Sequence, residues 1–388
     1  MNELSNKGAF IYFSKINSKL LTGIDKKVLS QVESFRKNGF YCKLVTCEAS
    51  NSIKDKLTSR LPWGSGTSFW TYRKEEYEDV EWLYFRRPYY FSKSFIDSLI
   101  AYKKDHPNSR IIMEIPTYPY DAEIKSDGLK NMPYLFIDRY NRKKLYKVVD
   151  RVATLTGDKY IFGIPTIKIR NGIDLDKIEV RKPKMIHFEN EINLGAVAIF
   201  GNAHAYERLL FGLREYYANS KHTRNVVLHL VGDGPDLKKY EKIVTDMNLE
   251  KVVKFHGMIN SSKLDELYNG FDLGVASLGL HRIGVECGSF LKSREYLAKG
   301  LPMITASKID ILEGQQFTFV ERFPADESNI SIEKIIKFHD RIYHNNESNI
   351  DVINNIRKFA NEHCGIDNMT KPVLDFLVNN SETNKLSY

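Results

Sequence analysis

The stretch HRIGVECGSFLKSREYLAKGLP, at residues 281–302, decides the fold that the sequence predicts. It follows an apolar run at 271–280 that has the length and composition of a buried strand. Ser289 then has the position of a helix N-cap, and the helix carries Lys292 and Arg294 in its first turn. Two cations there oppose the helix dipole, whereas a bound anion would be favoured by it. The stretch therefore predicts a strand, an anion-binding loop and a helix, as in a parallel α/β sheet.

The helix in this stretch also carries a family pattern. Its sequence REYLAKGLPMIT places Glu295, Ala298, Gly300 and Pro302 at the fixed positions of the motif Glu-Ala-x-Ala-x-Gly-x-Pro. It resembles the signature helix of glycosyltransferase family 4, whose members are retaining enzymes of the GT-B fold. The resemblance implies an α/β chain with two Rossmann-like domains that face each other across a cleft. It also implies a C-terminal helix that crosses back to the first domain.

Neighbouring residues extend the resemblance to the site. In the family, the glutamate that matches Glu295 binds the ribose of a nucleotide-sugar, and a second glutamate usually precedes it at a fixed spacing. Here Cys287 has that position, and Glu286 lies one residue further away. The pattern SFLKSREYLAKG resembles a bacterial subgroup that builds surface polysaccharides. In that subgroup the Ser-x-x-Lys element, Ser289 and Lys292 in this chain, stands on the donor phosphates.

Composition sets the class of protein and the expected number of domains. The chain has 388 residues, of which 42% are hydrophobic and 27% charged, and this is typical of a globular protein long enough for two domains. We expect an N-terminal acceptor-binding domain at 1–185, a C-terminal nucleotide-sugar-binding domain at 186–355, and a returning helix at 356–388.

Targeting signals and charge narrow the expected location and partners. The polar N-terminus indicates a first strand and not a signal peptide, and no apolar run reaches the roughly 20 residues that cross a bilayer. The four cysteines lie far apart, so we expect reduced thiols in the cytoplasm and no metal site. The net charge of +8 indicates an acidic partner: phosphorylated ligands, an anionic membrane surface or nucleic acid.

The first half alternates strands and helices, so the loops at the carboxyl ends of its strands are candidates for the acceptor site. Thr22 and Gly23 follow the first strand, although a glycine that only permits the turn is an equal alternative. The loop that follows the predicted strand at 110–115 is rich in hydroxyls and carboxylates. The acceptor residues predicted around it are Glu114, Thr117, Tyr118 and Tyr120.

Residues 134–151 combine basic and aromatic side chains. Helical spacing would gather them on an amphipathic basic face, which is typical of helices that dock on anionic membranes. A solvated helix face is the alternative, and a nucleic-acid surface is disfavoured because the chain has no recognised nucleic-acid motif. The predicted membrane-facing cations are Arg139, Arg142, Lys143, Lys144 and Lys147.

The second half again alternates strands with turns that open helices, although the G-x-G-x-x-G fingerprint is absent. Arg208, near a helix start, is a candidate clamp on the diphosphate, with a surface salt bridge as the alternative. His256 is a candidate contact to the nucleobase, with an ordinary turn residue as the alternative. The predicted donor-binding residues are Gly201, His204, Gly232, Gly234, His256, Gly257, Arg282, Glu286, Ser289, Phe290, Leu291 and Arg294.

The predicted function follows from these sites and from the resemblance. The resemblance implies a retaining, metal-independent glycosyltransferase that moves a sugar from a UDP- or GDP-sugar to a saccharide or lipid-linked saccharide in capsule or other surface-glycan synthesis. It would act in the cytoplasm or at the inner face of the membrane, with no cofactor besides its co-substrate. We expect Lys292, Glu295 and Arg208 to be catalytic, with the cations stabilising the departing diphosphate. The alternative is a non-catalytic nucleotide-sugar-binding subunit of a glycan assembly complex.

Overall fold

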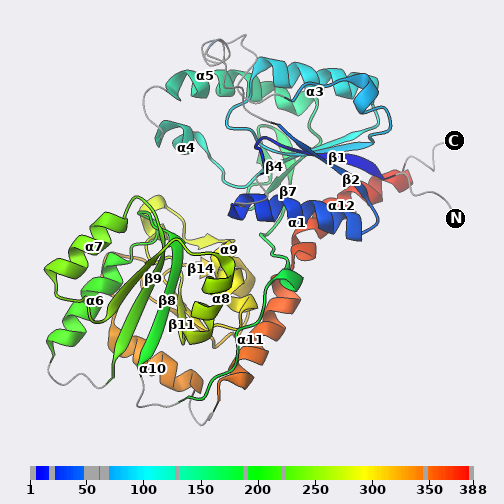
Figure 1. Cartoon of the computed structure of the whole chain (residues 1–388). Helices are drawn as coiled ribbons and strands as arrows, with labels where there is room; N and C mark the ends of the chain where they lie inside the picture. The colour runs from blue at the N-terminus through cyan, green and yellow to red at the C-terminus, as the bar shows by residue number, and fades with distance from the viewer. Residues whose placement is uncertain are drawn as a thin grey trace. The chain divides into compact units, whose positions relative to one another are not determined.

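The computed structural model describes residues 6–16, 22–47, 61, 70–126, 131–186, 191–219, 224–343 and 348–383. The chain divides into two compact units (Figure 1). Unit 1 consists of residues 1–170 together with 366–388, and unit 2 consists of residues 171–365. Each unit has its own sheet and its own core, and each is described by itself.

Unit 1 is built on a sheet whose strand order, over the described residues, is β2-β1-β3-β4-β5-β7-β6. All of its pairings are parallel except that of β6 with β7. The central strands are continuous apolar runs because helices cover both faces. The strands are β1 (Lys7–Tyr12), β2 (Tyr41–Thr46), β3 (Trp82–Arg86), β4 (Arg110–Ile115), β5 (Arg151–Thr154), β6 (Tyr160–Ile161) and β7 (Ile164–Lys168).

The helices of unit 1 form two layers, one on each face of this sheet (Figure 1). One face carries α1 and α12, and the other carries α3 and α5. A capping box at Thr22 and Asp25 starts α1, and the Ser92 hydroxyl caps α3. The α-helices are α1 (Gly23–Lys37), α3 (Lys93–Asp105), α4 (Asp121–Ser126), α5 (Met132–Asn141) and α12 (Ile366–Thr383).

Unit 2 is built on a sheet of order β10-β9-β8-β11-β13-β15 in which every pairing is parallel. The apolar run at 271–280 is a strand only over β11, after which the chain turns away from the sheet. A short pair, β12 (Cys287–Gly288) with β14 (Lys308–Ile309), lies apart from it. The strands of the main sheet are β8 (Ile192–Ile199), β9 (Val226–Asp233), β10 (Val253–Gly257), β11 (Leu273–Val275), β13 (Met303–Thr305) and β15 (Val320–Arg322).

Helices also cover both faces of the sheet in unit 2. One core cluster joins the sheet to α6, α7 and α10, and the other joins it to α8, α9 and α11. These helices are α6 (Glu207–Ala218), α7 (Leu237–Asp246), α8 (Ser261–Gly270), α9 (Leu291–Ala298), α10 (Ile332–Tyr343) and α11 (Ile350–His363).

The two crossings of the chain between the units differ from the domain boundaries predicted at 185 and 355. The chain leaves unit 1 after Arg170 and returns at Ile366. Packing explains the return point. Arg357 of α11 donates to the Ala298 carbonyl at 2.7 Å, which ties α11 to α9 in unit 2. The Ser34 and Thr370 hydroxyls lie 2.7 Å apart and tie α12 to α1 in unit 1.

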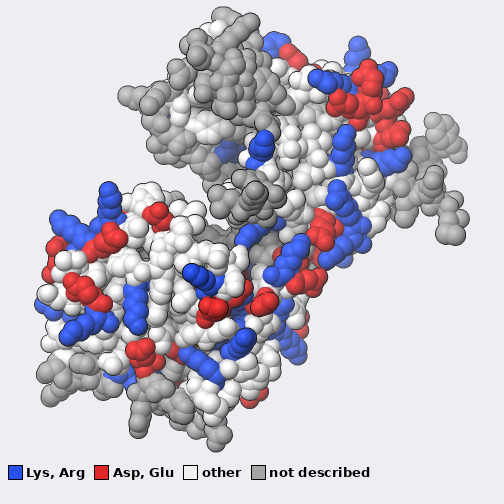
Figure 2. Space-filling model, in the orientation of Figure 1, with Lys and Arg blue, Asp and Glu red and all other residues white. Residues whose placement is uncertain are grey.

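The surface charge and the helices were compared with what membrane binding or membrane crossing would require. On the face shown in Figure 2, Lys and Arg side chains alternate with Asp and Glu over both units. Among the described residues, no helix combines the length and the apolar character needed to cross a bilayer.

Candidate functional site

The predicted donor residues lie at one edge of the sheet in unit 2. Because its strands are parallel, the loops after β8, β9, β10 and β11 leave the sheet at the same carboxyl edge. Helix α9 begins in the segment that follows β11. The structure therefore brings these predicted residues to one edge: Gly201, His204, Gly232, Gly234, His256, Gly257 and Arg282.

Two of these glycines have a backbone reason to be there. Gly232 has a φ of 131°, and a Cβ on it would lie 1.9 Å from the Ala198 carbonyl oxygen. Gly234 has a φ of 151°, and a Cβ on it would lie 2.3 Å from the Phe200 oxygen. Only glycine lets the end of β9 approach the end of β8 so closely. Gly201 has open space where a Cβ would stand.

Helix α9 begins differently from the prediction. Its N-cap is Phe290, with no side-chain cap, so the prediction that Ser289 caps the helix was wrong. The Ser289 hydroxyl instead accepts a hydrogen bond from the Asn171 backbone N–H at 2.7 Å. Ser289 therefore anchors the first residue of unit 2 to the loop before α9. Phe290 and Leu291 are half-buried at the helix start.

Lys292 lies at this edge with a neutral hydroxyl as its hydrogen-bond partner. Its Nζ donates to the Tyr206 hydroxyl at 2.9 Å and lies 5.5 Å from the centre of that ring. Burial lowers the pKa of Lys292 to about 7, although the negative charge of Glu295 opposes the shift. Within the described chain, no carboxylate forms an ion pair with it. The amine is poised to take a proton when an anion arrives.

His204 lies beside this lysine. Its Nδ1 accepts the Gly201 backbone N–H at 3.2 Å. Burial, and then the nearby charge of Lys292, lower the pKa of His204 to about 4. The imidazole is therefore neutral at physiological pH. Because Nδ1 accepts a hydrogen bond, the proton of the ring is on Nε2, which can donate to a ligand.

Glu295 lies one turn along α9 from Lys292, so the two side chains share a face of the helix. The Tyr268 hydroxyl donates to Glu295 Oε1 at 3.3 Å. The sequence predicted that Lys292 binds the donor phosphates and that Glu295 binds the ribose hydroxyls. A cation and a half-buried carboxylate on one helix face are chemically suited to hold both parts of a nucleotide-sugar.

The two predicted arginine ligands have structural partners. Arg294 is fully buried, and its Nη2 donates to both carboxylate oxygens of Asp310, at 2.8 and 2.9 Å. Arg208 is 1% exposed and donates to the carbonyls of Leu278, Ser328 and Pro324. These contacts place both guanidinium groups in the core of unit 2. Their positions do not support direct contact with a phosphate, because neither presents its charge to solvent.

Arg282 and Glu286 are nearer the surface. Arg282 forms ion pairs with Glu207 at 2.8 Å and with Glu327, and these carboxylates raise its pKa further. The exposed Glu286 lies next to Cys287, whose thiol donates to Glu313 at 3.4 Å. His256 at the end of β10 contacts His229, with 2.9 Å between their ring nitrogens. The predicted donor contacts of these residues, and of Gly257, stay predictions.

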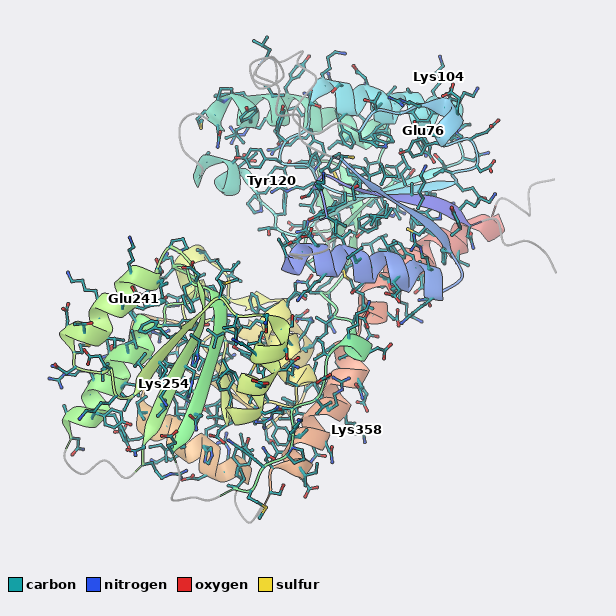
Figure 3. The ribbon with its side chains drawn as sticks, viewed as in Figure 1. Glu76, Lys104, Tyr120, Glu241, Lys254 and Lys358 are labelled. Atoms are coloured by element: carbon teal, nitrogen blue, oxygen red, sulfur yellow. The ribbon has the colours of Figure 1, made fainter. Side chains whose placement is uncertain are left out.

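The predicted acceptor residues of unit 1 fall into a buried pair and an exposed group. Glu114 is fully buried and accepts from Lys27, Gln31, Tyr84 and Arg86. Tyr120, labelled in Figure 3, is 1% exposed and donates to Asp138 at 2.9 Å. Neither side chain presents surface to an acceptor, so their positions do not support direct contact. Sequence alone did not show that a carboxylate and a phenol in this segment would be enclosed.

The exposed group comprises Thr22, Gly23 and Thr117, with Tyr118 half-buried against Phe162. Thr22 is the N-cap of α1, and its Oγ1 accepts the Asp25 backbone N–H at 3.1 Å. Thr117 lines a small pocket at the carboxyl ends of β3 and β4. Its acceptor role stays a prediction.

The basic segment divides into paired and exposed cations. Arg139 and Arg142 both bind Asp121 at 2.6 Å, and Arg142 also binds Asp138 at 3.0 Å, so two carboxylates match the two cations. Lys143 and Lys147 are exposed, and Lys144 lies 4.6 Å from the centre of the Tyr140 ring. The exposed large aromatic residues here are Phe136, Tyr140 and Tyr146.

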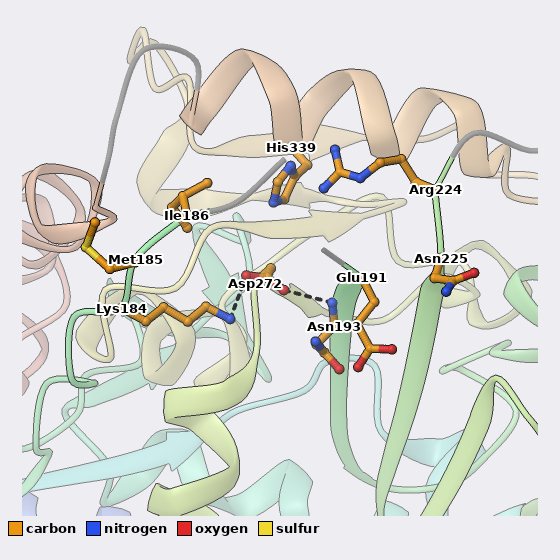
Figure 4. A pocket seen from close by; sticks show the side chains of 9 residues that line it. All are labelled: Lys184, Met185, Ile186, Glu191, Asn193, Arg224, Asn225, Asp272 and His339. Carbon is orange, nitrogen blue, oxygen red and sulfur yellow. Dashed lines mark hydrogen bonds and ion pairs between the residues drawn. The ribbon is translucent and has the colours of Figure 1, made fainter. Parts of the chain in front are cut away.

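A pocket that sequence reasoning missed lies at the opposite, amino edge of the sheet in unit 2. It has a volume of about 400 Å³ and includes Asn193, Asp272 and His339 in its lining (Figure 4). Lys184 forms an ion pair with Asp272 at 2.8 Å, and Asp272 also accepts the Asn193 backbone N–H (Figure 4). Its charges compensate one another, and it lies far along the strands from α9.

Three comparisons with known proteins complete the description of the site. Residues 195–337 match the family described as "Glycosyl transferases group 1". This region includes all the predicted donor-binding residues and Lys292 and Glu295 of α9. A search of curated protein sequences found no match.

Solved structures resemble the whole chain. HepE from Anabaena, in complex with UDP and glucose, has 12% identity and a TM-score of 0.56, with 96% of this chain and 99% of that chain covered. A glycosyltransferase from Rickettsia africae has 13% identity and a TM-score of 0.57, with coverage of 98% and 100%. The apo lipopolysaccharide outer core galactosyltransferase WaaB has 13% identity and a TM-score of 0.53, with coverage of 98% and 100%. The likeness confirms the GT-B fold that the sequence predicted.

Proposed function

We propose that this chain is a glycosyltransferase of the family 4 type that moves a sugar from a UDP- or GDP-sugar to a saccharide or lipid-linked saccharide. The GT-B fold and the match of residues 195–337 to the group 1 family support the proposal. Transfer would retain the anomeric configuration and need no metal, in the synthesis of a cell-surface glycan. The observation that carries the proposal is the pair Lys292 and Glu295 on one face of α9, at the carboxyl edge of a parallel sheet.

The residues divide the work of binding and of stabilising the leaving group. The nucleoside diphosphate departs with a developing negative charge, and Lys292 and the N–H groups at the start of α9 would stabilise it. Glu295 would accept hydrogen bonds from the ribose hydroxyls. His204 would donate from Nε2 to the diphosphate or to the sugar. The departing phosphate oxygen would take the proton of the acceptor hydroxyl.

Two of the similar structures support the choice of substrates. HepE was solved with UDP and glucose, so UDP-sugars are the first donors to test. WaaB is a lipopolysaccharide outer core galactosyltransferase, which supports a surface-glycan acceptor.

The test is thermal stabilisation and sugar release with UDP-, GDP-, ADP- and CMP-sugars, each with and without EDTA. We expect one nucleotide class to raise Tm, equally with EDTA, and to be cleaved slowly. Stabilisation without cleavage or transfer to any acceptor would instead favour the non-catalytic donor-binding subunit. No stabilisation by any nucleotide would contradict both functions.

We also propose that the exposed part of the basic segment docks unit 1 on an anionic membrane surface. Lysines beside exposed aromatic rings combine electrostatic attraction with side chains that suit the interface. The test is sedimentation with phosphatidylserine and phosphatidylcholine vesicles. The double variant Lys143→Glu/Lys147→Glu should lose binding to the anionic vesicles. Lys242→Glu/Lys337→Glu, with the same net charge and exposed positions in unit 2, should keep it. Equal loss in both would contradict the proposal.

A further inference from the structure

The pocket at the carboxyl ends of β3 and β4 has an unusual lining. It has a volume of about 180 Å³ and lies between the loops that follow the two strands. Two arginines line it, and no acidic residue is among its lining residues in the described chain. The lining residues are Arg86, Arg87, Pro88, Tyr89, Pro116 and Thr117.

Arg86 is held in place by a buried anchor. Its Nη1 donates to Glu114 Oε1 at 2.9 Å, and Lys27 donates to the same oxygen at 2.9 Å. Gln31 and Tyr84 donate to Oε2 at 2.9 and 2.7 Å, so the carboxylate cannot rotate. Glu114 thus accepts from two cations, Lys27 and Arg86. The side chain of Arg86 is 20% exposed and reaches the pocket.

Glu114 is ionised throughout the physiological pH range. Burial raises the pKa of its carboxyl, but Lys27, Arg86 and their hydrogen bonds outweigh burial and lower it to about 2. The carboxylate therefore orients Arg86 at every physiological pH.

Arg87 has a separate anchor. Its guanidinium lies 3.9 Å from the centre of the Tyr120 ring and donates to the Pro88 carbonyl at 3.2 Å. Tyr120 is itself fixed by Asp138. Beside the two arginines, Tyr89 is 40% exposed, and Thr117 offers an exposed hydroxyl. The pocket thus combines positive charge with an aromatic face and a hydroxyl.

We propose that this pocket binds an acidic sugar of the acceptor, with its carboxylate or phosphate between Arg86 and Arg87. Guanidinium groups match the planar geometry of a carboxylate and the oxygens of a phosphate, and preoriented groups lose little freedom on binding. The exposed ring of Tyr89 offers an apolar face to the sugar ring. This inference rests on the proposed function, because it names the substrate class of the acceptor side of the same transferase.

The test compares glucuronic acid, glucose 1-phosphate and glucose by ligand-observed NMR binding. It is run on the Lys292→Met variant, which weakens the binding of a phosphate at the donor site. We expect at least one acidic sugar to bind about tenfold more tightly than glucose. Preference for the uronate indicates a carboxylate ligand, and preference for the sugar phosphate indicates a phosphate ligand. If both acids bind no better than glucose, the proposal is overturned.

Matched variants assign the preference to the pocket. Arg86→Gln should abolish the preference for an acidic sugar, because it removes a positive charge from the pocket. The variant should still fold, since Gln31, Tyr84 and Lys27 still donate to Glu114. Arg73→Gln, an exposed arginine on the surface of unit 1, should keep the preference. An unchanged preference in Arg86→Gln would also overturn the proposal. Stabilisation of the wild-type protein by UDP is measured in parallel, so that failure of the donor site is distinguished from failure of the acidic acceptor.

Discussion

Each edge of the sheet in unit 2 has a partly buried lysine, and the two lysines differ in whether a carboxylate pairs with them. At the amino edge, Lys184 forms an ion pair with Asp272 at 2.8 Å, and the polar lining of that pocket is internally matched. At the carboxyl edge, the Tyr206 hydroxyl is the only hydrogen-bond partner of Lys292 among the described residues. The first arrangement serves the folded state. The second leaves a charge that costs stability until an anion arrives, and this is typical of a binding site.

The same contrast separates the arginines from Lys292. Arg208 and Arg294 lie near the same edge, but Arg208 donates to backbone carbonyls and Arg294 forms an ion pair with Asp310. A cation near a site is therefore no evidence of ligand binding until its protein partners are known. Three variants test this contrast, and a fourth tests the backbone geometry of the same edge.

The largest effect is expected from Lys292→Met. Loss of the cation should lower kcat/KM by about 100-fold to 1000-fold and abolish the rise in Tm that the nucleotide causes. Without ligand the variant should be more stable than wild type below pH 7, where the lysine must be charged while buried. This gain should fade as pH rises from 7 toward 10.5, the usual pKa of lysine. The exposed Lys358→Met, labelled in Figure 3, is the control and should change neither property.

The second effect concerns Arg294. Asp310→Ala would leave its guanidinium buried without a carboxylate, which costs about 3 kcal/mol or more in the free energy of unfolding. Chemical denaturation measures the loss, and Asp246→Ala on the exposed end of α7 is the control. A change in nucleotide affinity with no change in stability would show instead that Arg294 serves the ligand.

The third effect separates two glycines at the carboxyl edge. Gly232→Ala should cost about 2–3 kcal/mol, since its φ and its contact with the Ala198 oxygen both exclude a Cβ. Gly201→Ala, where the space is open, should change the free energy of unfolding little. Equal losses in both variants would contradict the geometry described for the end of β9.

The smallest effect is expected from Lys184→Met. Asp272 is 4% exposed and keeps its hydrogen bond from the Asn193 N–H, so the loss should be about 1 kcal/mol. Nucleotide-induced stabilisation should be the same as in wild type. A weakened response to nucleotide would mean that the amino-edge pocket belongs to the functional site.

The sequence predicted what depends on local pattern. The spacing of Glu295, Ala298, Gly300 and Pro302 identified α9 and the GT-B fold, and the alternation of strands and helices indicated the parallel sheets. The sequence could not show which charges would be compensated, because the partners are distant in the chain. Arg208 lies 118 residues from Asp326, and Glu114 lies 87 residues from Lys27. Tyr206 and Tyr268, which contact Lys292 and Glu295, carried no sequence signal.

The central claim is that Lys292 is the cation that receives the donor diphosphate. The most direct test is the number of protons taken up when the nucleotide binds at pH 8, measured by calorimetry in buffers of different ionisation enthalpy. A lysine with a pKa of about 7 is largely neutral at that pH, and a bound diphosphate favours its charged form. We predict uptake of nearly one proton in the wild-type protein and almost none in any residual binding by Lys292→Met. Binding without proton uptake, or equal uptake in both proteins, would contradict the account.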